Sequence, residues 1–135
     1  MPHILIVEDE SSTSWALAEG LSDDGFTIDT FARAEEALDW LKHSRSDLII
    51  TDLQLPGMSG LELARRVRRR RSAPPVIVVT AYGTPEAISR LQAVGVADCL
   101  TKPFAIERLR RSVQRALEAS TSPSGLAGPA RRSRP

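Results

Sequence analysis

Five short apolar segments recur along the chain and alternate with stretches of helical spacing. The segments are residues 4–7, 26–31, 48–50, 76–79 and a weaker 96–100. The first, third and fourth are continuous and rich in isoleucine and valine, which is typical of strands buried on both faces of a parallel sheet. Right-handed crossovers between such strands place helices on both faces. The alternation therefore predicts an α/β domain with a doubly wound parallel sheet.

Apolar residues at intervals of three and four lie between these segments and predict five helices. The helical sets are Trp15, Ala18 and Leu21; Ala34, Ala37, Leu38 and Leu41; Leu61, Ala64 and Val67; Ile88, Leu91 and Val94; and Ile106, Leu109, Val113 and Leu117. Gly25 and Gly95 follow the first and fourth sets, where a left-handed cap favours glycine. Thr84 and Pro85 are the expected N-cap and first residue of the fourth helix.

Length and composition fit one domain over residues 1–119. The chain has 135 residues, of which 41% are hydrophobic and 26% charged, as in an average globular domain. Its single cysteine, Cys99, excludes an internal disulfide or a cysteine-based zinc cage. No apolar run is long enough to cross a bilayer and no basic leader opens the chain, so a cytoplasmic protein without membrane association is expected.

The last segment differs in composition from the rest. Residues 120–135 are rich in Pro, Gly, Ser and Arg and have no periodicity, so they are expected to be a flexible tail or the start of a linker. The tail is basic and the remainder is close to neutral. The charge balance therefore gives no reason to expect nucleic-acid binding by this domain.

Polar side chains follow the apolar segments at the points where strands should end. Glu8 and Asp9 follow the first, Asp52 the third, Thr80 the fourth and Lys102 the fifth. In an open parallel sheet these ends share the edge where ligands bind. Three acids, a hydroxyl and an ammonium group are therefore expected to gather in one place.

Such a group of side chains fits phosphoryl transfer onto a carboxylate. Clustered carboxylates raise one another's pKa unless a cation neutralises them, and Mg²⁺ typically takes one or two carboxylates together with a phosphate. The remaining carboxylate can act as a nucleophile, with lysine and threonine donating to phosphoryl oxygens.

Each residue, taken alone, also has an ordinary explanation. Glu8 and Asp9 could be solvated loop residues, Asp52 an N-cap and Thr80 a strand residue. Lys102 could lie on the surface, although this sequence has 16 arginines and only two lysines. The combination, with each residue after its own strand, favours a functional site.

Four motifs resemble the receiver domains of bacterial two-component response regulators. They are residues 4–10 (ILIVEDE), 51–60 (TDLQLPGMSG), 79–83 (VTAYG) and 100–104 (LTKPF). The resemblance covers about residues 3–118. It implies a flavodoxin-like (βα)₅ fold with strand order 2-1-3-4-5 and a cis peptide bond between Lys102 and Pro103.

The resemblance also implies a magnesium site and a phosphoryl donor. Asp52 would be phosphorylated from a phosphohistidine on a sensor histidine kinase or phosphotransfer protein. Asp9 and Asp52 would bind Mg²⁺ through carboxylates, Glu8 mainly through water, and Gln54 through its backbone carbonyl.

The remaining motif residues would contact the phosphoryl group. Lys102 and Thr80 would hold its oxygens, while Leu53 and Ala81 would offer backbone N–H groups. The domain would then be a phosphorylation-controlled module, not an enzyme beyond its own phosphorylation and dephosphorylation.

The switch residues depart from the family pattern in one place. Cys99, three residues before Lys102, occupies the position where the family usually has a tyrosine or phenylalanine as a rotating switch; Thr80 matches the family's switch threonine. Cysteine has no ring to rotate, so Tyr82 could provide an aromatic gate instead. A small buried thiol is a simpler explanation of Cys99 than a redox sensor.

Two other classes of protein fit less well. An aspartyl-nucleophile phosphatase usually has a second acid two residues after the nucleophile, where this chain has Gln54. A pseudo-receiver that works without phosphorylation is supported only by Cys99.

The clustered arginines, the two histidines and the two tryptophans lie outside these motifs. The arginines in residues 65–71 and on the last helix (108–115) could be solvated or could dock partners, and the last helix could mediate a homodimer. His3 and His43 are given no catalytic role. Trp15 and Trp40 are expected to pack on neighbouring residues.

Overall fold

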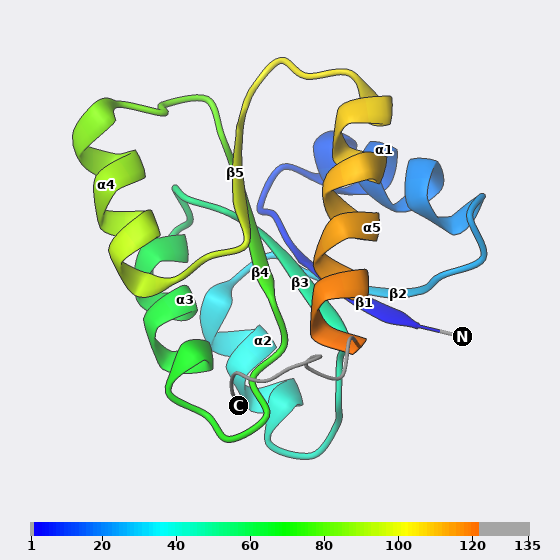
Figure 1. Ribbon diagram of the computed structural model, residues 1–135, viewed down its shortest axis with the longest axis horizontal. Helices are drawn as coiled ribbons and strands as arrows, with labels where there is room; N and C mark the ends of the chain where they lie inside the picture. The colour runs from blue at the N-terminus through cyan, green and yellow to red at the C-terminus, as the bar shows by residue number, and fades with distance from the viewer. Residues whose placement is uncertain (1, 122–135) are drawn as a thin grey trace.

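A five-stranded parallel sheet forms the centre of the molecule, in the order β2-β1-β3-β4-β5. The computed structural model describes residues 2–121, and Figure 1 shows the sheet between two layers of helices. The strands are β1 (His3–Val7), β2 (Thr27–Phe31), β3 (Leu48–Asp52), β4 (Val76–Thr80) and β5 (Asp98–Thr101). The helices are α1 (Ser11–Ser22), α2 (Ala34–Leu41), α3 (Gly60–Arg68), α4 (Pro85–Val94) and α5 (Ile106–Thr121). The predicted strand order and the alternation of five strands with five helices are confirmed.

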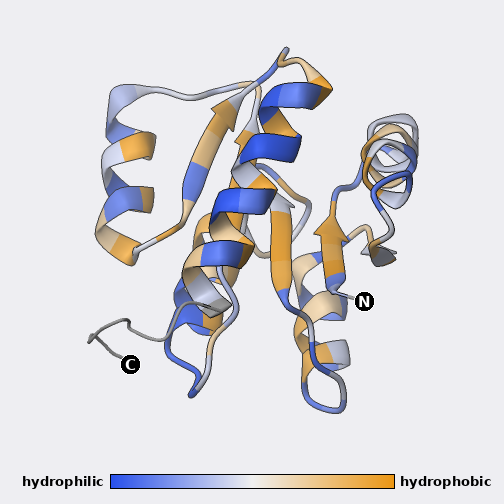
Figure 2. Ribbon diagram, turned by 45° about the vertical axis from the view of Figure 1, so that its right-hand side comes forward, coloured by the Kyte–Doolittle hydropathy of each residue, from blue (hydrophilic) through white to orange (hydrophobic). Residues whose placement is uncertain are grey.

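Two hydrophobic layers hold the helices on the sheet. Ile4 and Ile6 of β1 face α1 and α5, whereas Leu5 and Val7 face α2, α3 and α4. Successive side chains of a strand point to opposite faces, so a strand covered on both faces needs an uninterrupted apolar run. Figure 2 shows these apolar strands between helices whose outer faces are hydrophilic.

The predicted helix ends agree with the structure. The Thr84 hydroxyl accepts a hydrogen bond from the Ala87 N–H at 3.2 Å, and Pro85 is the first residue of α4. Gly25 and Gly95 have positive φ angles of 88° and 94°. The Lys102–Pro103 peptide bond is cis, as predicted.

The predicted packing of α1 is confirmed for Leu21 and Ala18, which lie in or against the core, and wrong for Trp15. Trp15 is 67% exposed, and the buried residues of α1 are Ser14, Leu17 and Leu21. A side chain at Gly20 would lie 2.6 Å from the side chain of Ile106, so the lack of one lets α1 approach α5 closely on this side. Trp40, by contrast, stacks on the His3 ring with centroids 4.9 Å apart.

The chain beyond the sheet continues as helix. Helix α5 runs to Thr121, so it includes the first two residues of the predicted tail. The rest of that tail, residues 122–135, lies outside the described residues. Among the helices of residues 2–121, none combines the length and hydrophobicity needed to span a membrane.

Candidate functional site

Four neighbouring strands, β1, β3, β4 and β5, bring the predicted site residues to one edge of the sheet. Asp52 is the last residue of β3, while Glu8 and Asp9 directly follow β1, which pairs with β3. Thr80 ends β4, on the other side of β3, and Lys102 directly follows β5. Because all five strands are parallel, these residues share the carboxyl edge.

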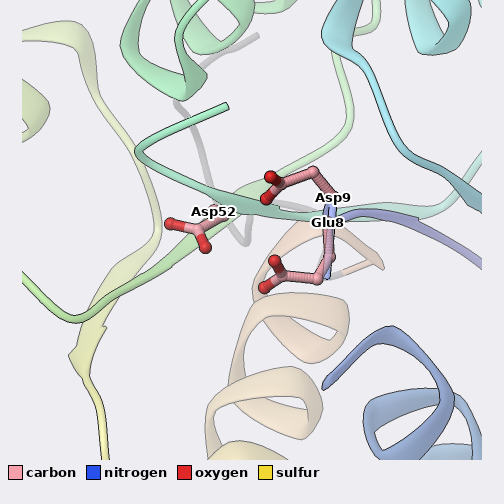
Figure 3. A group of neighbouring side chains, drawn as sticks. All are labelled: Glu8, Asp9 and Asp52. Atoms are coloured by element: carbon pink, nitrogen blue, oxygen red, sulfur yellow. The ribbon is translucent and has the colours of Figure 1, made fainter. Parts of the chain in front are cut away.

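Three carboxylates meet at this edge. Glu8, Asp9 and Asp52 each offer an oxygen atom, and these atoms lie within 4.8 Å of one another. Figure 3 shows the three side chains gathered where β1 and β3 end. Glu8 and Asp52 are only 4% and 8% exposed, whereas Asp9 is open to solvent. Carboxylate oxygens are suitable ligands for Mg²⁺, and the solvent-exposed side of the cluster leaves room for the water molecules that this ion usually keeps.

One ammonium group lies between the two buried acids. The Lys102 Nζ atom donates to Glu8 Oε1 and to Asp52 Oδ2, both at 3.0 Å. Burial raises the pKa of Glu8, although its hydrogen bond from Lys102 opposes this effect. Burial works against the charged form of Lys102, but its bonds to the two carboxylates outweigh that effect and raise its pKa. The Lys102 ammonium therefore pairs with two of the three clustered acids, Glu8 and Asp52.

Backbone N–H groups around Asp52 already have partners. The Gln54 N–H donates to Asp52 Oδ1 at 3.1 Å, and the Leu53 N–H donates to the Val79 carbonyl at 3.2 Å. The predicted role of Leu53 on a phosphoryl oxygen would require that second bond to be shared or broken. Sequence reasoning assigned Gln54 only its carbonyl, although an aspartate that accepts from the residue two positions later is a common turn motif.

The hydroxyl and aromatic residues predicted for the switch lie on and after β4. Thr80 is fully buried, and its Oγ1 accepts a hydrogen bond from the Tyr82 N–H at 3.0 Å. The Tyr82 side chain is 63% exposed, and Ala81 between them is also exposed. The contacts of Thr80 and Ala81 with a phosphoryl group remain predictions.

Comparison with known proteins identifies this arrangement. A family model described as the response regulator receiver domain matches residues 4–114. The chain belongs to this family. The receiver domain is a signalling domain of two-component systems that a histidine kinase phosphorylates, so the function indicated by the four motifs is confirmed.

Individual relatives agree with this assignment. The phosphate regulon transcriptional regulatory protein PhoB of Rhizobium meliloti is 40% identical over 116 residues, which cover 84% of this chain and 51% of that protein. The crystal structure of chemotaxis response regulator CheY4 of Vibrio cholerae has a TM-score of 0.80 and 34% identity, with 87% of this chain and 99% of that chain covered.

A third similar protein, TrrA from Thermotoga maritima, was solved in complex with Mg²⁺-BeF. Its TM-score is 0.79 and its identity 34%, with 87% of this chain and 100% of that chain covered. The chain spans about a quarter to a half of the length of the curated relatives NtrC and PhoB.

Gly60 positions the receiver site and was missed in the sequence. A Cβ atom at this residue would lie 2.0 Å from the Asp52 carbonyl oxygen, and the Gly60 N–H donates to the Leu53 carbonyl at 2.8 Å. Helix α3 therefore begins directly against the backbone of Asp52. The signal available was a glycine just after Ser59, whose hydroxyl caps α3 by accepting from the Glu62 N–H.

Cys99 is a partly buried residue of β5. It lies opposite Val78 of β4 and packs with the layer that includes Leu91. Burial, and to a smaller extent the charge of Asp98, raises the pKa of the thiol, so the reactive thiolate is disfavoured. This environment suits a structural thiol. Whether Cys99 or Tyr82 takes part in switching stays a prediction.

Proposed function

We propose that Asp52 is the phosphoacceptor of this receiver domain and that Glu8, Asp9 and Asp52, with the Gln54 carbonyl, hold Mg²⁺. The observation that supports this most directly is the position of Asp52. It is a buried carboxylate at the end of a central strand, beside two further acids and one ammonium group.

In the proposed reaction, a carboxylate oxygen of Asp52 attacks the phosphorus atom of a phosphohistidine on the partner. The new O–P bond forms as the P–N bond breaks, and the bonding electron pair returns to the imidazole nitrogen. The product is an aspartyl phosphate and a free histidine.

Residues around Asp52 support this step electrostatically. The Lys102 ammonium lies 3.0 Å from Asp52 Oδ2. It can stabilise the negative charge of the carboxylate before the reaction and that of the phosphoryl oxygens during and after it. The Thr80 hydroxyl and the N–H groups of Leu53 and Ala81 are the further proposed donors. Bound Mg²⁺ would neutralise the acids and a phosphoryl oxygen together, and the complex of TrrA with Mg²⁺-BeF supports such a site.

The proposed partners follow from the same reading. A sensor histidine kinase or a phosphotransfer protein donates the phosphoryl group in the cytoplasm. The domain itself binds no nucleic acid and catalyses nothing beyond its own phosphorylation and dephosphorylation. A homodimer could form through α5, on which Arg111 and Arg115 are exposed.

Intact-mass spectrometry after incubation with acetyl phosphate and Mg²⁺ tests the proposal. The wild-type protein should gain one phosphate, and Asp52→Asn should gain none. Asp23→Asn is the matched control, because it removes an exposed acid outside the site. Equal labelling of Asp52→Asn and wild type would refute the assignment. A folded wild-type protein that is never labelled would instead be a pseudo-receiver.

A further inference from the structure

The loop from Asp52 to helix α3 (residues 53–59) is fastened firmly at its two ends. The Leu53 N–H donates to Val79, the Gln54 N–H donates to Asp52, and the Gly60 N–H returns to the Leu53 carbonyl. These bonds fix the loop where it leaves β3 and where it enters α3. They do not reach its tip at Gly57 and Met58.

A side chain from another element holds this tip. Glu35, in the first turn of α2, accepts a hydrogen bond from the Met58 N–H through Oε2 at 3.1 Å. Gly57 has a φ angle of +76°, and a Cβ atom there would lie 2.5 Å from the same oxygen. Glycine at this position thus permits both the left-handed turn and the close approach of the carboxylate.

The charge on Glu35 suits this contact. Its own backbone N–H and that of Met58 hold the pKa of Glu35 below its usual value. A carboxylate in the first turn of a helix is also favoured by the helix dipole. The acceptor is therefore ionised at neutral pH, and its hydrogen bond with Met58 is charge-assisted.

We propose that Glu35 is a positioning residue for the Mg²⁺ site, which it serves by holding the tip of the 53–59 loop. This inference rests on the proposed function, in which the Gln54 carbonyl is a metal ligand. A backbone carbonyl is placed only as well as the loop that carries it, because it has no rotamer of its own to adjust. Residues that orient metal ligands typically change affinity by about tenfold or more; because Glu35 acts through a loop, a loss of about fivefold is expected.

Three variants separate positioning from loss of charge. Glu35→Ala removes the acceptor, whereas Glu35→Gln keeps an acceptor oxygen without the charge. Glu36→Gln removes a charge from the next residue, which is exposed and has no side-chain partner within residues 2–121. Mg²⁺ affinity is measured by calorimetry, and the amides of Gln54 and Met58 are followed by ¹H–¹⁵N NMR. Thermal unfolding without Mg²⁺ reports fold stability.

The expected result is a Kd for Mg²⁺ about five times higher in Glu35→Ala and within twofold of wild type in Glu35→Gln and Glu36→Gln. The Gln54 and Met58 amide signals should shift most in Glu35→Ala, less in Glu35→Gln and not in Glu36→Gln. Gly57→Ala provides a second route to the same effect, since its methyl group would displace the Glu35 carboxylate. It should therefore weaken Mg²⁺ binding even if Glu35→Ala folds poorly.

Two negative results have different meanings. If the wild type binds Mg²⁺ and both Glu35→Ala and Gly57→Ala bind it equally well, the role of Glu35 is refuted and the proposed function stands. A lower unfolding temperature with unchanged Kd would also refute it, leaving Glu35 as a purely structural contact. If the wild type itself binds no Mg²⁺, the proposed function fails and this inference fails with it.

Discussion

Asp98 at the start of β5 and the three acids at the carboxyl edge of the sheet differ in how far their negative charge is balanced. The single carboxylate of Asp98 accepts from the Ser112 hydroxyl at 2.7 Å, the Cys99 N–H at 2.8 Å and the Arg108 guanidinium at 3.2 Å. At the carboxyl edge, the Lys102 ammonium group pairs with two of the three carboxylates, those of Glu8 and Asp52.

The pKa directions express this difference. Burial disfavours the charged form of Asp98, but its three hydrogen bonds outweigh that effect and lower its pKa. Burial instead raises the pKa of Glu8. The hydrogen-bonding capacity of Asp98 is thus filled by neighbouring residues, and its bonds to Arg108 and Ser112 link β5 to α5. The three acids around Asp52 carry more negative charge than Lys102 neutralises. A bound metal ion can provide the missing positive charge.

The largest predicted effect on stability comes from removing Lys102, the cation that pairs with Glu8 and Asp52. Lys102→Ala should destabilise the Mg²⁺-free protein by about 2 kcal/mol, because two buried carboxylates lose their partner. This value is reduced from that of a fully buried pair, because the Lys102 side chain is 24% exposed. Saturating Mg²⁺ should restore most of the loss, as urea unfolding with and without the metal would show.

Lys102→Arg sharpens the same comparison, since it keeps the charge. The longer planar guanidinium should not take the place of a compact ammonium between Glu8 and Asp52. The variant should label poorly with acetyl phosphate or give smaller NMR shifts once labelled. Normal labelling and a full response would remove the ammonium of Lys102 from the mechanism.

Asp98→Asn should have the next largest effect on stability, and Mg²⁺ should not restore this loss. It places an amide beside donors that need an acceptor, so the protein should lose about 1–2 kcal/mol of stability. Mg²⁺ should stabilise the variant and the wild type by equal amounts in urea unfolding. A stability gain from Mg²⁺ that is smaller than in wild type would show that the two acidic groups are coupled.

Asp9→Asn is predicted to weaken Mg²⁺ binding by about tenfold, because it removes a direct anionic ligand. Without metal the same variant should be slightly more stable, by less than about 1 kcal/mol, because like charges are relieved. No cation lies within ion-pair distance of Asp9 in the described part of the chain. Unchanged affinity by calorimetry would exclude Asp9 as a ligand.

The smallest predicted effect is a difference in acid sensitivity. Since the folded pKa of Asp98 lies below its ordinary value of 3.8, its contribution to stability is complete above that value and is lost as the pH falls below it. Wild type and Asp98→Asn should therefore differ in unfolding free energy at neutral pH, and the difference should shrink as the pH falls below the ordinary pKa of the carboxyl. A constant difference across this range would contradict the lowered pKa.

The sequence predicts the carboxyl edge well because two simple regularities meet there. Buried parallel strands are continuous apolar runs, and the residues that follow them lie at one edge of the sheet. The sequence therefore predicts that Glu8, Asp52 and Lys102 lie close together. The end of β3 was less clear. Hydropathy stops at Ile50, but backbone pairing continues until Asp52 lies opposite Val79, and hydrogen bonds leave no trace in a hydropathy pattern.

Contacts between distant elements were not predictable from spacing. The exposure of Trp15 and the close approach of Gly20 to Ile106 both arise from the way the helices pack. The bonds of Asp98 to Ser112 and of Glu35 to Met58 join residues from different elements. Each depends on packing distances that a single sequence does not contain.

Locating the phosphate tests the central claim most directly. The protein is phosphorylated in the presence of Mg²⁺, the acyl phosphate is trapped by borohydride reduction, and tryptic peptides are sequenced by mass spectrometry. Cleavage after Arg45 and Arg65 releases residues 46–65, which hold Asp47, Asp52 and Glu62 as candidate sites. The modification is predicted at Asp52 alone. Its recovery at Asp9, at Asp98 or at another acid of this peptide would contradict the account.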